Sequence, residues 1–288
     1  MRTQLIGRIE FDKEKLAQDL ERSFHITFAE PFDEFICGRP WKSAMLMTPG
    51  GGHGTALTQF DSSVPADVTG EGAKLPYVQE IIRKHFVAEH ITFARLVVLN
   101  DSVFVPHCDY IDLSDDTSRS RIAHRVHIVL ATGEDAMFNE SDTIFRMREG
   151  EVWFLDAAKP HSAGVVGETR RVHLLIDMAD VPDLEDLFTF DAELSRTIPP
   201  SNLCARPRLS EAEREGLHGL SRVIDEENFT QVLGLVIRKH YRRDGGPDFV
   251  WSTMREIARL SENDRIVGRV TDLFSHTNLQ RREASRTS

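Results

Sequence analysis

Three side chains in this sequence are of types that bind transition metals, and their spacing suggests one site. His107 and Asp109 stand two residues apart, and His161 follows further along the chain. Two imidazoles and one carboxylate are the donor set of a non-haem iron(II) centre, which leaves coordination positions open. Arg171 comes shortly after His161 and could hold a carboxylate through its forked guanidinium group.

The spacing of His107 and Asp109 carries little weight alone, because a His-x-Asp triplet is expected about once by chance in such a chain. Residues 103–105 are apolar and predict a strand, so His107 comes at a strand end. In extended backbone, residues i and i+2 point to the same side, so the two side chains can converge while Cys108 points away. Zinc more often takes cysteine or a third histidine, so this donor set favours iron.

The elements that must position these residues are mostly β-strands. Apolar runs between turn residues predict strands at 5–11, 91–99, 103–105, 126–130, 143–147, 151–155 and 172–178. Short strands at this spacing, without helices between them, favour an antiparallel sandwich or barrel. His161 is expected just past the end of one strand and Arg171 at the start of another.

The N-terminal third mixes helices with a long irregular stretch. Asp12 can cap a short helix, and residues 74–86 place an apolar face on a second helix with Pro76 in its first turn. Residues 45–72 contain a glycine run at 50–54 and few apolar residues, which predicts a loop or flexible lid outside the core.

The C-terminal part reads as helical. Ser210 and Glu213 form a capping-box pattern, and three more amphipathic segments follow. We therefore expect two parts: a β-rich core with N-terminal helices at 1–200, and a helical region at 201–288.

Composition narrows the classes of function. The chain has 288 residues, and its 35 basic and 46 acidic residues give a net charge of −11. An acidic chain without a basic stripe is a poor candidate for binding nucleic acid or an anionic membrane. No apolar run approaches the roughly 20 residues that span a bilayer, and no signal-peptide pattern is seen. Three scattered cysteines argue for a reducing compartment, so we expect a cytoplasmic protein.

Around the candidate site, four segments carry a specific resemblance to a known family: Phe104 to Tyr110, Arg125 to Leu130, Gly150 to Gly164 and Arg171 to Asp177. There the chain resembles the bacterial free-proline hydroxylases, which are iron(II)/2-oxoglutarate oxygenases that make cis-3- or cis-4-hydroxyproline. These belong to the wider aspartyl/asparaginyl β-hydroxylase-like group. The resemblance continues through the N-terminal segments and the C-terminal helices, and departs mostly in loops such as 49–54.

This resemblance implies a mainly β fold with helical additions, built on a double-stranded β-helix (jelly-roll, cupin-like) core with a C-terminal helical region. It implies that His107, Asp109 and His161 bind Fe(II), and that no catalytic residue is needed beyond the metal site. Arg171 resembles the residue that pairs with the distal carboxylate of 2-oxoglutarate. Dioxygen is then the second co-substrate, and ascorbate is the expected reductant.

Further roles follow from the same resemblance. In the wider group an Arg-x-His pair on one strand serves the carboxylates of co-substrate and substrate. We therefore assign His127 to 2-oxoglutarate and Arg125 to the substrate. Arg95 is another candidate for the substrate carboxylate, with a solvated strand arginine as an equal alternative. His173 shares a strand face with Arg171, but a packed strand histidine is the expected interpretation.

The expected reaction is hydroxylation of a free cyclic L-imino acid at ring C3 or C4, with succinate and CO2 as co-products. L-proline and its ring homologue L-pipecolic acid stay open as substrates. Two alternatives also stay open: hydroxylation of another amino acid or a protein side chain, and a non-catalytic β-barrel binding protein. We expect a small-molecule partner without nucleic acid or membrane, and a homodimer through the C-terminal helices stays open.

Overall fold

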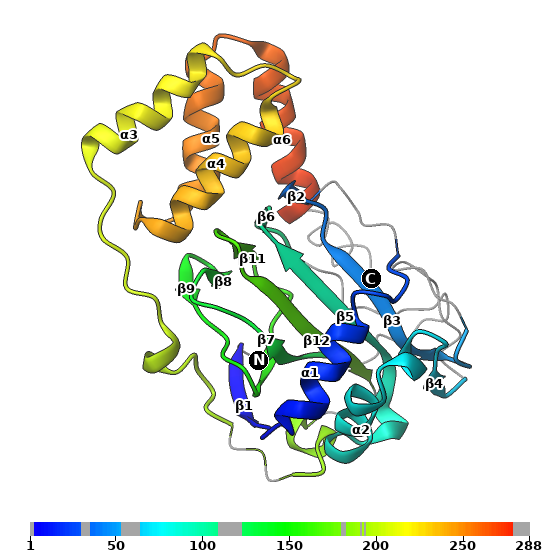
Figure 1. The fold of residues 1–288 in the computed structure, drawn as a ribbon. Helices are drawn as coiled ribbons and strands as arrows, with labels where there is room; N and C mark the ends of the chain where they lie inside the picture. Colours follow the sequence, from blue (N-terminus) through cyan, green and yellow to red (C-terminus); the bar gives the residue numbers. More distant parts are fainter. Residues whose placement is uncertain are drawn as a thin grey trace, which may run out of the picture.

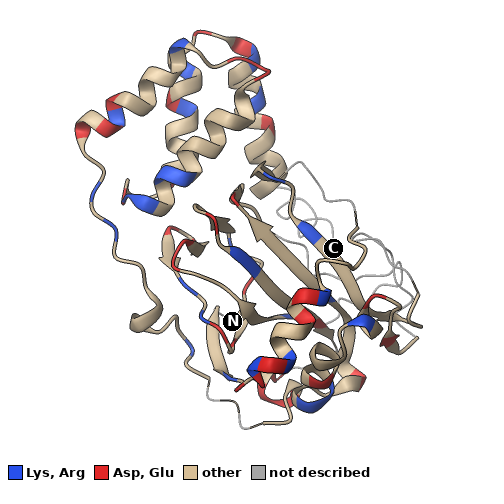
Figure 2. Cartoon of the chain, viewed as in Figure 1, with Lys and Arg blue, Asp and Glu red and all other residues tan. Residues whose placement is uncertain are grey.

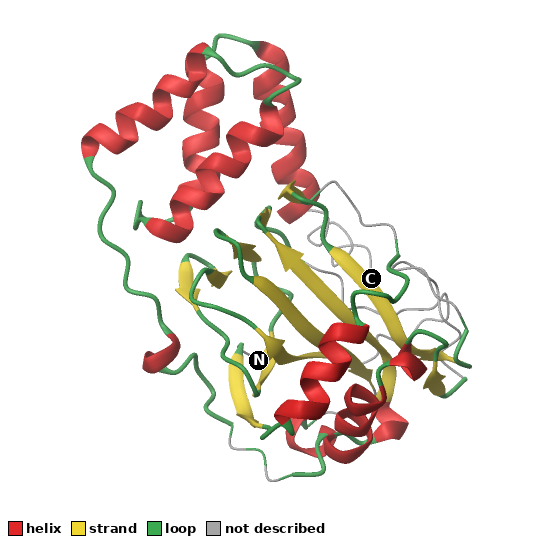
Figure 3. Ribbon diagram, in the orientation of Figure 1, coloured by secondary structure: helices red, strands yellow, loops and turns green. Residues whose placement is uncertain are grey.

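Two β-sheets stacked face to face form the centre of the protein (Figures 1 and 3). The computed structural model describes residues 3–29, 35–52, 64–108, 123–179, 183–190, 192 and 194–278. Its strands are β1 Gln4–Arg8, β2 Ile36–Gly38, β3 Lys42–Pro49, β4 Ala66–Val68, β5 Ile91–Asn100, β6 Ser102–Phe104, β7 Ala123–Ala131, β8 Ala136–Glu140, β9 Thr143–Phe145, β10 Glu151–Leu155, β11 His161–Val165 and β12 Arg170–Ala179. The larger sheet has the order β1-β10-β7-β12-β5-β3-β4 and the smaller one β2-β6-β11-β8-β9. Neighbouring strands pair antiparallel in both sheets.

Helices cover the outer faces of both sheets, so the protein has four layers (Figure 1). They are α1 Lys13–Arg22, α2 Pro76–His85, α3 Glu211–His218, α4 Phe229–Arg242, α5 Phe249–Leu260 and α6 Asp264–Asn278. Short 3₁₀ helices lie at Gly72–Lys74, Ala88–His90, Leu184–Leu187, Pro200–Asn202 and Gly219–Arg222. Charged residues gather on the helices and connecting segments, whereas the strands are largely uncharged (Figure 2). None of the helices in the described part of the chain is long and apolar enough to cross a membrane.

Alternation along the strands separates three apolar clusters. On β7 and β12 of the larger sheet, Ile128 and Leu174 point outward and pack with α1 and α2. The residues that alternate with these two along each strand point toward the smaller sheet. Leu175, for example, packs there with Phe138 and Trp153. The other face of the smaller sheet packs against α3 to α6. Any polar residue that alternates with Ile128 or Leu174 therefore lies between the sheets.

The strand that carries His161 is held from outside by α4. Ser162 shares a hydrogen bond of 2.9 Å with the buried hydroxyl of Tyr241. A Cβ on Gly164 would lie 2.7 Å from a ring carbon of Tyr241, so only glycine allows this close approach. His161 and Ala163 alternate with these two residues, and Ala163 packs between the sheets.

The predicted fold is confirmed: mainly β with helical additions, a two-sheet jelly-roll core and C-terminal helices. The predicted caps are also confirmed. Asp12 accepts hydrogen bonds from the first turn of α1, Pro76 opens α2, and Ser210 and Glu213 form a capping box on α3. The boundary between the two predicted parts at residue 200 stays a prediction.

The prediction of a loop or lid at residues 45–72 was wrong at both ends. Met45 to Thr48 belong to β3 and are buried on both faces, and residues 66–68 form β4. A strand buried on both faces shows no alternation of apolar and polar residues, which hides it in the sequence. The middle of this segment, 53–63, lies outside the described residues. His161, expected after a strand, instead begins β11.

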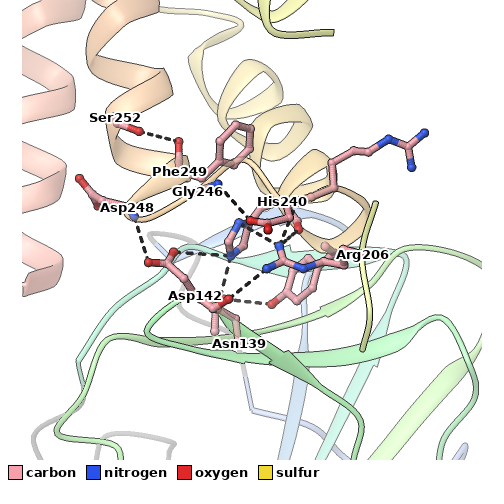
Figure 4. A network of polar contacts seen from close by, with 12 residues as sticks. Asn139, Asp142, Arg206, His240, Gly246, Asp248, Phe249 and Ser252 are labelled. Carbon is pink, nitrogen blue, oxygen red and sulfur yellow. Dashed lines mark hydrogen bonds and ion pairs between the residues drawn. The ribbon is translucent and has the colours of Figure 1, made fainter. Parts of the chain in front are cut away.

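A polar junction ties the helical region to the smaller sheet (Figure 4). Arg206 donates to the carbonyls of His240 and Arg243 at the end of α4, and to the carbonyl of Asp142 in the β8–β9 turn. His240 is 1% exposed, and its Nε2 lies 3.3 Å from Oδ1 of Asn139. The amide oxygen can only accept, so Nε2 carries a proton. Nδ1 lies 3.4 Å from a guanidinium nitrogen of Arg206, which can only donate, so the His240 ring is neutral.

We expect this junction to make stability depend on pH. Burial and the nearby Arg206 lower the pKa of His240 to about 4, although Asp244 opposes this. A lowered pKa means that the stabilisation is complete above the ordinary histidine pKa of 6.5 and is lost as the pH falls toward 4. The full loss is on the order of 3 kcal/mol.

Urea unfolding between pH 7 and pH 4 tests this, with His240→Gln as the comparison. The variant should lose less stability than the parent protein over that interval, because its side chain does not titrate. If the free energy of unfolding falls equally in both proteins between pH 7 and pH 4, His240 is not the group responsible.

Candidate active site

Two of the three predicted metal ligands meet across a backbone bridge. His107 follows β6, and His161 begins β11. The N–H of His107 donates to the carbonyl of His161 at 3.0 Å, and the reverse bond is 2.8 Å. Directly paired residues on antiparallel segments point to the same side, and the two ring centroids are 4.6 Å apart.

Both imidazoles are oriented by a carbonyl two residues earlier in the chain. Nδ1 of His107 lies 2.6 Å from the carbonyl oxygen of Val105, and Nδ1 of His161 lies 2.9 Å from that of Lys159. A carbonyl accepts but does not donate, so Nδ1 carries the proton in each ring. The lone pair is then on Nε2, which is the arrangement that metal-binding histidines usually have.

The third predicted ligand, Asp109, lies outside the described residues. Among the residues that the structure does describe, no three His, Cys, Asp or Glu side chains form a metal-binding group. The chemistry of the two neutral imidazoles fits a divalent metal that is completed by a third donor and by exchangeable ligands.

A second polar cluster lies between the sheets. Arg171 and His173 of β12 and His127 of β7 are 2%, 0% and 4% exposed. One terminal nitrogen of Arg171 lies 3.2 Å from Nδ1 of His173, and its guanidinium lies 4.4 Å from the ring centroid of Phe138. Because guanidinium only donates, Nδ1 of His173 accepts this bond and the ring is neutral. Phe138 and His173 together fix the plane of the Arg171 guanidinium.

Burial and mutual repulsion keep the two histidines uncharged. Burial, followed by the positive charges of Arg171, Arg125 and Arg95, holds the pKa of His127 well below its usual range, and His161 adds to this. The pKa of His173 is also held well below its usual range by burial and by Arg171. Burial lowers the pKa of Arg171 to about 9, so this residue is the cation of the cluster at neutral pH.

The cluster has several unmade hydrogen bonds. Nε of Arg171, both ring nitrogens of His127 and Nε2 of His173 are buried without a partner. Buried polar atoms are nearly always paired, because leaving one unpaired costs about 1–3 kcal/mol. No carboxylate in the described part of the chain pairs with Arg171. A buried cation beside neutral imidazoles fits an anionic ligand with several oxygens, such as the dicarboxylate 2-oxoglutarate.

The predicted substrate residues lie further along the same sheet face. Arg125 sits opposite Asp177 in the β7–β12 register and binds it with two hydrogen bonds of 2.8 and 3.2 Å. Asp177 therefore fixes the orientation of the Arg125 side chain. Arg95 of β5 sits opposite Leu175 of β12, and its guanidinium lies 5.7 Å from the ring centroid of Phe93.

The register gives the order of these groups in the site. On β12, Arg171 and Asp177 are separated by about 20 Å of extended chain. His127 pairs with Leu175, between these two ends. The structure thus places the predicted co-substrate arginine at one end and the predicted substrate arginines toward the other. Their roles stay predictions.

Sequence reasoning missed Phe138 and Asp177, and it interpreted His173 as a packed strand histidine rather than as part of this cluster. The signal for His173 was present, since it follows Arg171 by two residues and so shares its strand face. Asp177 stands six residues after Arg171 and also shares that face. Phe138 lies on β8, a strand that was not predicted, so its contact with Arg171 had no signal in the sequence.

Comparisons with known proteins show which family the chain resembles. A sequence profile described as "Aspartyl/Asparaginyl beta-hydroxylase" matches residues 7–180, and one described as "L-proline 3-hydroxylase, C-terminal" matches 185–284. The chain is 32% identical to L-proline cis-3-hydroxylase 1 of Streptomyces sp, over 93% of this chain and 91% of that one. It is 28% identical to L-proline cis-4-hydroxylase of Rhizobium meliloti, over 95% and 94%. A solved viral collagen prolyl hydroxylase from Paramecium Bursaria Chlorella virus-1 aligns with 11% identity and a TM-score of 0.38, over 63% of this chain and 97% of that one.

The Arg171 cluster predicts a loss of 2-oxoglutarate binding on substitution. Arg171→Gln should weaken binding at least about 10-fold, because a hydrogen bond to a charged group contributes roughly 1.5–3 kcal/mol. Isothermal titration of 2-oxoglutarate into the protein loaded with Co(II) measures this.

The neighbouring Arg170 is a matched control for this measurement. It points to the opposite face, donates to Ser23 at 2.9 Å and lies 4.1 Å from the ring centroid of Phe24. Arg170→Gln should bind 2-oxoglutarate as the parent protein does, and equal losses in both variants would count against the assignment.

Proposed function

This chain belongs to the aspartyl/asparaginyl β-hydroxylase family and, within it, to the L-proline hydroxylases; from that premise we propose that it hydroxylates a free cyclic L-imino acid with Fe(II), 2-oxoglutarate and dioxygen. The proposal rests most on the buried cluster of Arg171, His173 and His127, which has several polar atoms without a hydrogen-bond partner. The charge of His161 also contributes to the lowered pKa of His127, which links the cluster to a proposed metal ligand. That cluster has the charge and the donors to hold a dicarboxylate next to a metal.

The metal would be held by His107, Asp109 and His161. Bound iron(II) supplies the oxidation of a C–H bond by dioxygen, with 2-oxoglutarate as the source of two electrons. The protein supplies position: carbonyls hold both imidazoles with Nε2 toward the metal.

The co-substrate would be held by Arg171 and His127. Arg171 binds the distal carboxylate in a bidentate fork, and its plane is set by Phe138 and His173. His127, kept neutral by burial and by Arg171, donates one hydrogen bond to a carboxylate oxygen without adding a second charge.

The substrate carboxylate would be held by Arg125 and Arg95, toward the other end of the same face. Asp177 keeps Arg125 in a fixed orientation, so the arginine is preorganised for a carboxylate. L-proline is the first candidate, because the relatives are named for it. L-pipecolic acid differs by one methylene, which a pocket discriminates by about 1–3 kcal/mol.

We also propose the co-products, the reductant, the ring position and the compartment of the reaction. Succinate and CO2 are the co-products, and ascorbate keeps the iron reduced. The site of hydroxylation is ring C3 or C4, and the protein works in the cytoplasm, because three scattered cysteines suit a reducing compartment.

A turnover assay tests the proposal. The protein, Fe(II), ascorbate and 2-oxoglutarate are combined with L-proline, L-pipecolic acid or a proline-containing peptide. Succinate should form much faster with a free imino acid, whose mass rises by one oxygen, and NMR of the product gives the ring position. Asp109→Ala and His161→Ala should abolish turnover, because each removes a metal donor.

His85→Gln is the control, since His85 ends α2 on the outer side of the larger sheet. Oxygen gained by the peptide alone would favour a protein hydroxylase. If the parent protein forms no succinate with any of these substrates and ligand binding survives in Asp109→Ala, a binding protein would be favoured.

A further inference from the structure

One predicted metal ligand is part of a stack of three rings that reaches into the C-terminal helices. The ring of Phe35 stacks on His107 with centroids 5.4 Å apart and an angle of 29°. On its other side it stacks on His276 of α6, with centroids 5.5 Å apart and an angle of 5°. Phe35 therefore lies between a candidate ligand and the last turn of α6.

Backbone hydrogen bonds fix both ends of this stack. The N–H of Val105 donates to the carbonyl of Phe35 at 2.7 Å, and the carbonyl of Val105 accepts from the His107 ring. On the helix side, the N–H of Cys108 donates to the carbonyl of Thr277 at 3.0 Å. Val105, two residues before His107, is thus tied to Phe35, and Cys108, the next residue, is tied to α6.

The last turn of α6 is itself held in place. Phe274 packs edge-on against Trp251 of α5 at 5.4 Å and lies 4.4 Å from the guanidinium of Arg255. Thr277 is 3% exposed. Beside the stack is a cavity of about 900 Å³ whose walls include Ile36, Val105 and His276. The ring stack therefore joins the helical region and the strands at a place where close packing is interrupted.

We propose that Phe35, held between His107 and His276, positions the His107 imidazole for metal binding, and that the last turn of α6 is thereby a working part of the metal centre. The carbonyl of Val105 fixes which nitrogen of His107 carries the proton, whereas the Phe35 ring restricts rotation of the imidazole about its bond to Cβ. This proposal rests on the proposed function, because that is what makes His107 a ligand.

Co(II) titration followed by visible absorption tests the proposal without turnover. Phe35→Leu keeps an apolar side chain but loses the ring, and it should weaken Co(II) binding about 2- to 10-fold, the range of one aromatic pair. Phe35→Tyr keeps the ring and should bind Co(II) as the parent protein does. At saturating metal, the KM for 2-oxoglutarate of Phe35→Leu should be unchanged, since the Arg171 cluster is untouched.

Phe190→Leu is the matched control. Phe190 is also half-buried and pairs with another ring, Phe188 at 5.0 Å, on the far side of the larger sheet. It should leave Co(II) binding unchanged. Equal affinity in Phe35→Leu and the parent protein would overturn the proposal, as would a loss in Phe35→Tyr as large as in Phe35→Leu.

His107→Ala separates this proposal from the proposed function. If His107→Ala binds Co(II) as the parent does, the metal assignment itself fails. If it loses binding while Phe35→Leu does not, only the role of Phe35 fails.

Amide exchange gives a second measurement, in case Phe35→Leu does not fold. Coupling between two sites is reciprocal, so Co(II) should slow exchange in the last turn of α6 and leave α3 unaffected. Exchange in α6 that does not change at saturating Co(II) would overturn the proposal.

Discussion

His107 and His161, the two proposed metal ligands in the described part of the chain, exchange two backbone hydrogen bonds, and this pairing holds their imidazoles side by side. The pair extends the antiparallel pairing of β6 with β11 in the smaller sheet. The two imidazoles therefore lie on the same side of the sheet, although their segments are far apart in sequence. Side chains alone could not hold two rings so close, because each has free rotation about two bonds. The bridge fixes both backbones, and the carbonyls of Val105 and Lys159 then remove most of the rotation that is left.

The space between the sheets imposes a second constraint, on charge. Arg171 is 2% exposed, and moving a cation out of water is costly unless an anion and hydrogen bonds compensate. Phe138 offers the face of its ring, and His173 offers one acceptor. Neither carries a negative charge. Among the residues that the structure describes, the compensation is therefore incomplete, and a dicarboxylate would complete it. Burial, followed by the same positive charge, holds the pKa values of His127 and His173 well below the usual range, so the cluster offers one cation with neutral imidazoles around it.

Much of this arrangement could be predicted from sequence, because the periodicity of apolar residues and the capping of helices depend on residues that are close in sequence. Helices α1, α2 and α3 begin where Asp12, Pro76 and Ser210 predict them. The first N–H groups of a helix have no partner within it, so Asp12 and Ser210 accept from them, and Pro76 has no N–H to satisfy. The face shared by Arg125 and His127 follows from strand alternation in the same way.

What could not be predicted depends on partners distant in sequence. β11 reads His-Ser-Ala-Gly-Val, which has low strand propensity, and it is a strand because β8 pairs with it and Tyr241 covers it. The ion pair of Arg125 with Asp177 and the stack of Phe35 on His107 are likewise set by register and by packing between layers. Sequence therefore identified residues of the right chemistry, whereas the structure shows which of them face each other.

The helical region contacts both segments of the smaller sheet that carry a candidate ligand. Tyr241 of α4 holds the outer face of β11 beside His161, and Thr277 of α6 holds the backbone next to His107. A movement of these helices against the sheet would therefore shift one imidazole relative to the other. If the two imidazoles bind one metal as proposed, part of its binding free energy would also stabilise the docking of the helices. The helical region is then coupled to the chemistry without supplying a ligand, because it holds the two ligand-bearing strands of the smaller sheet in one geometry.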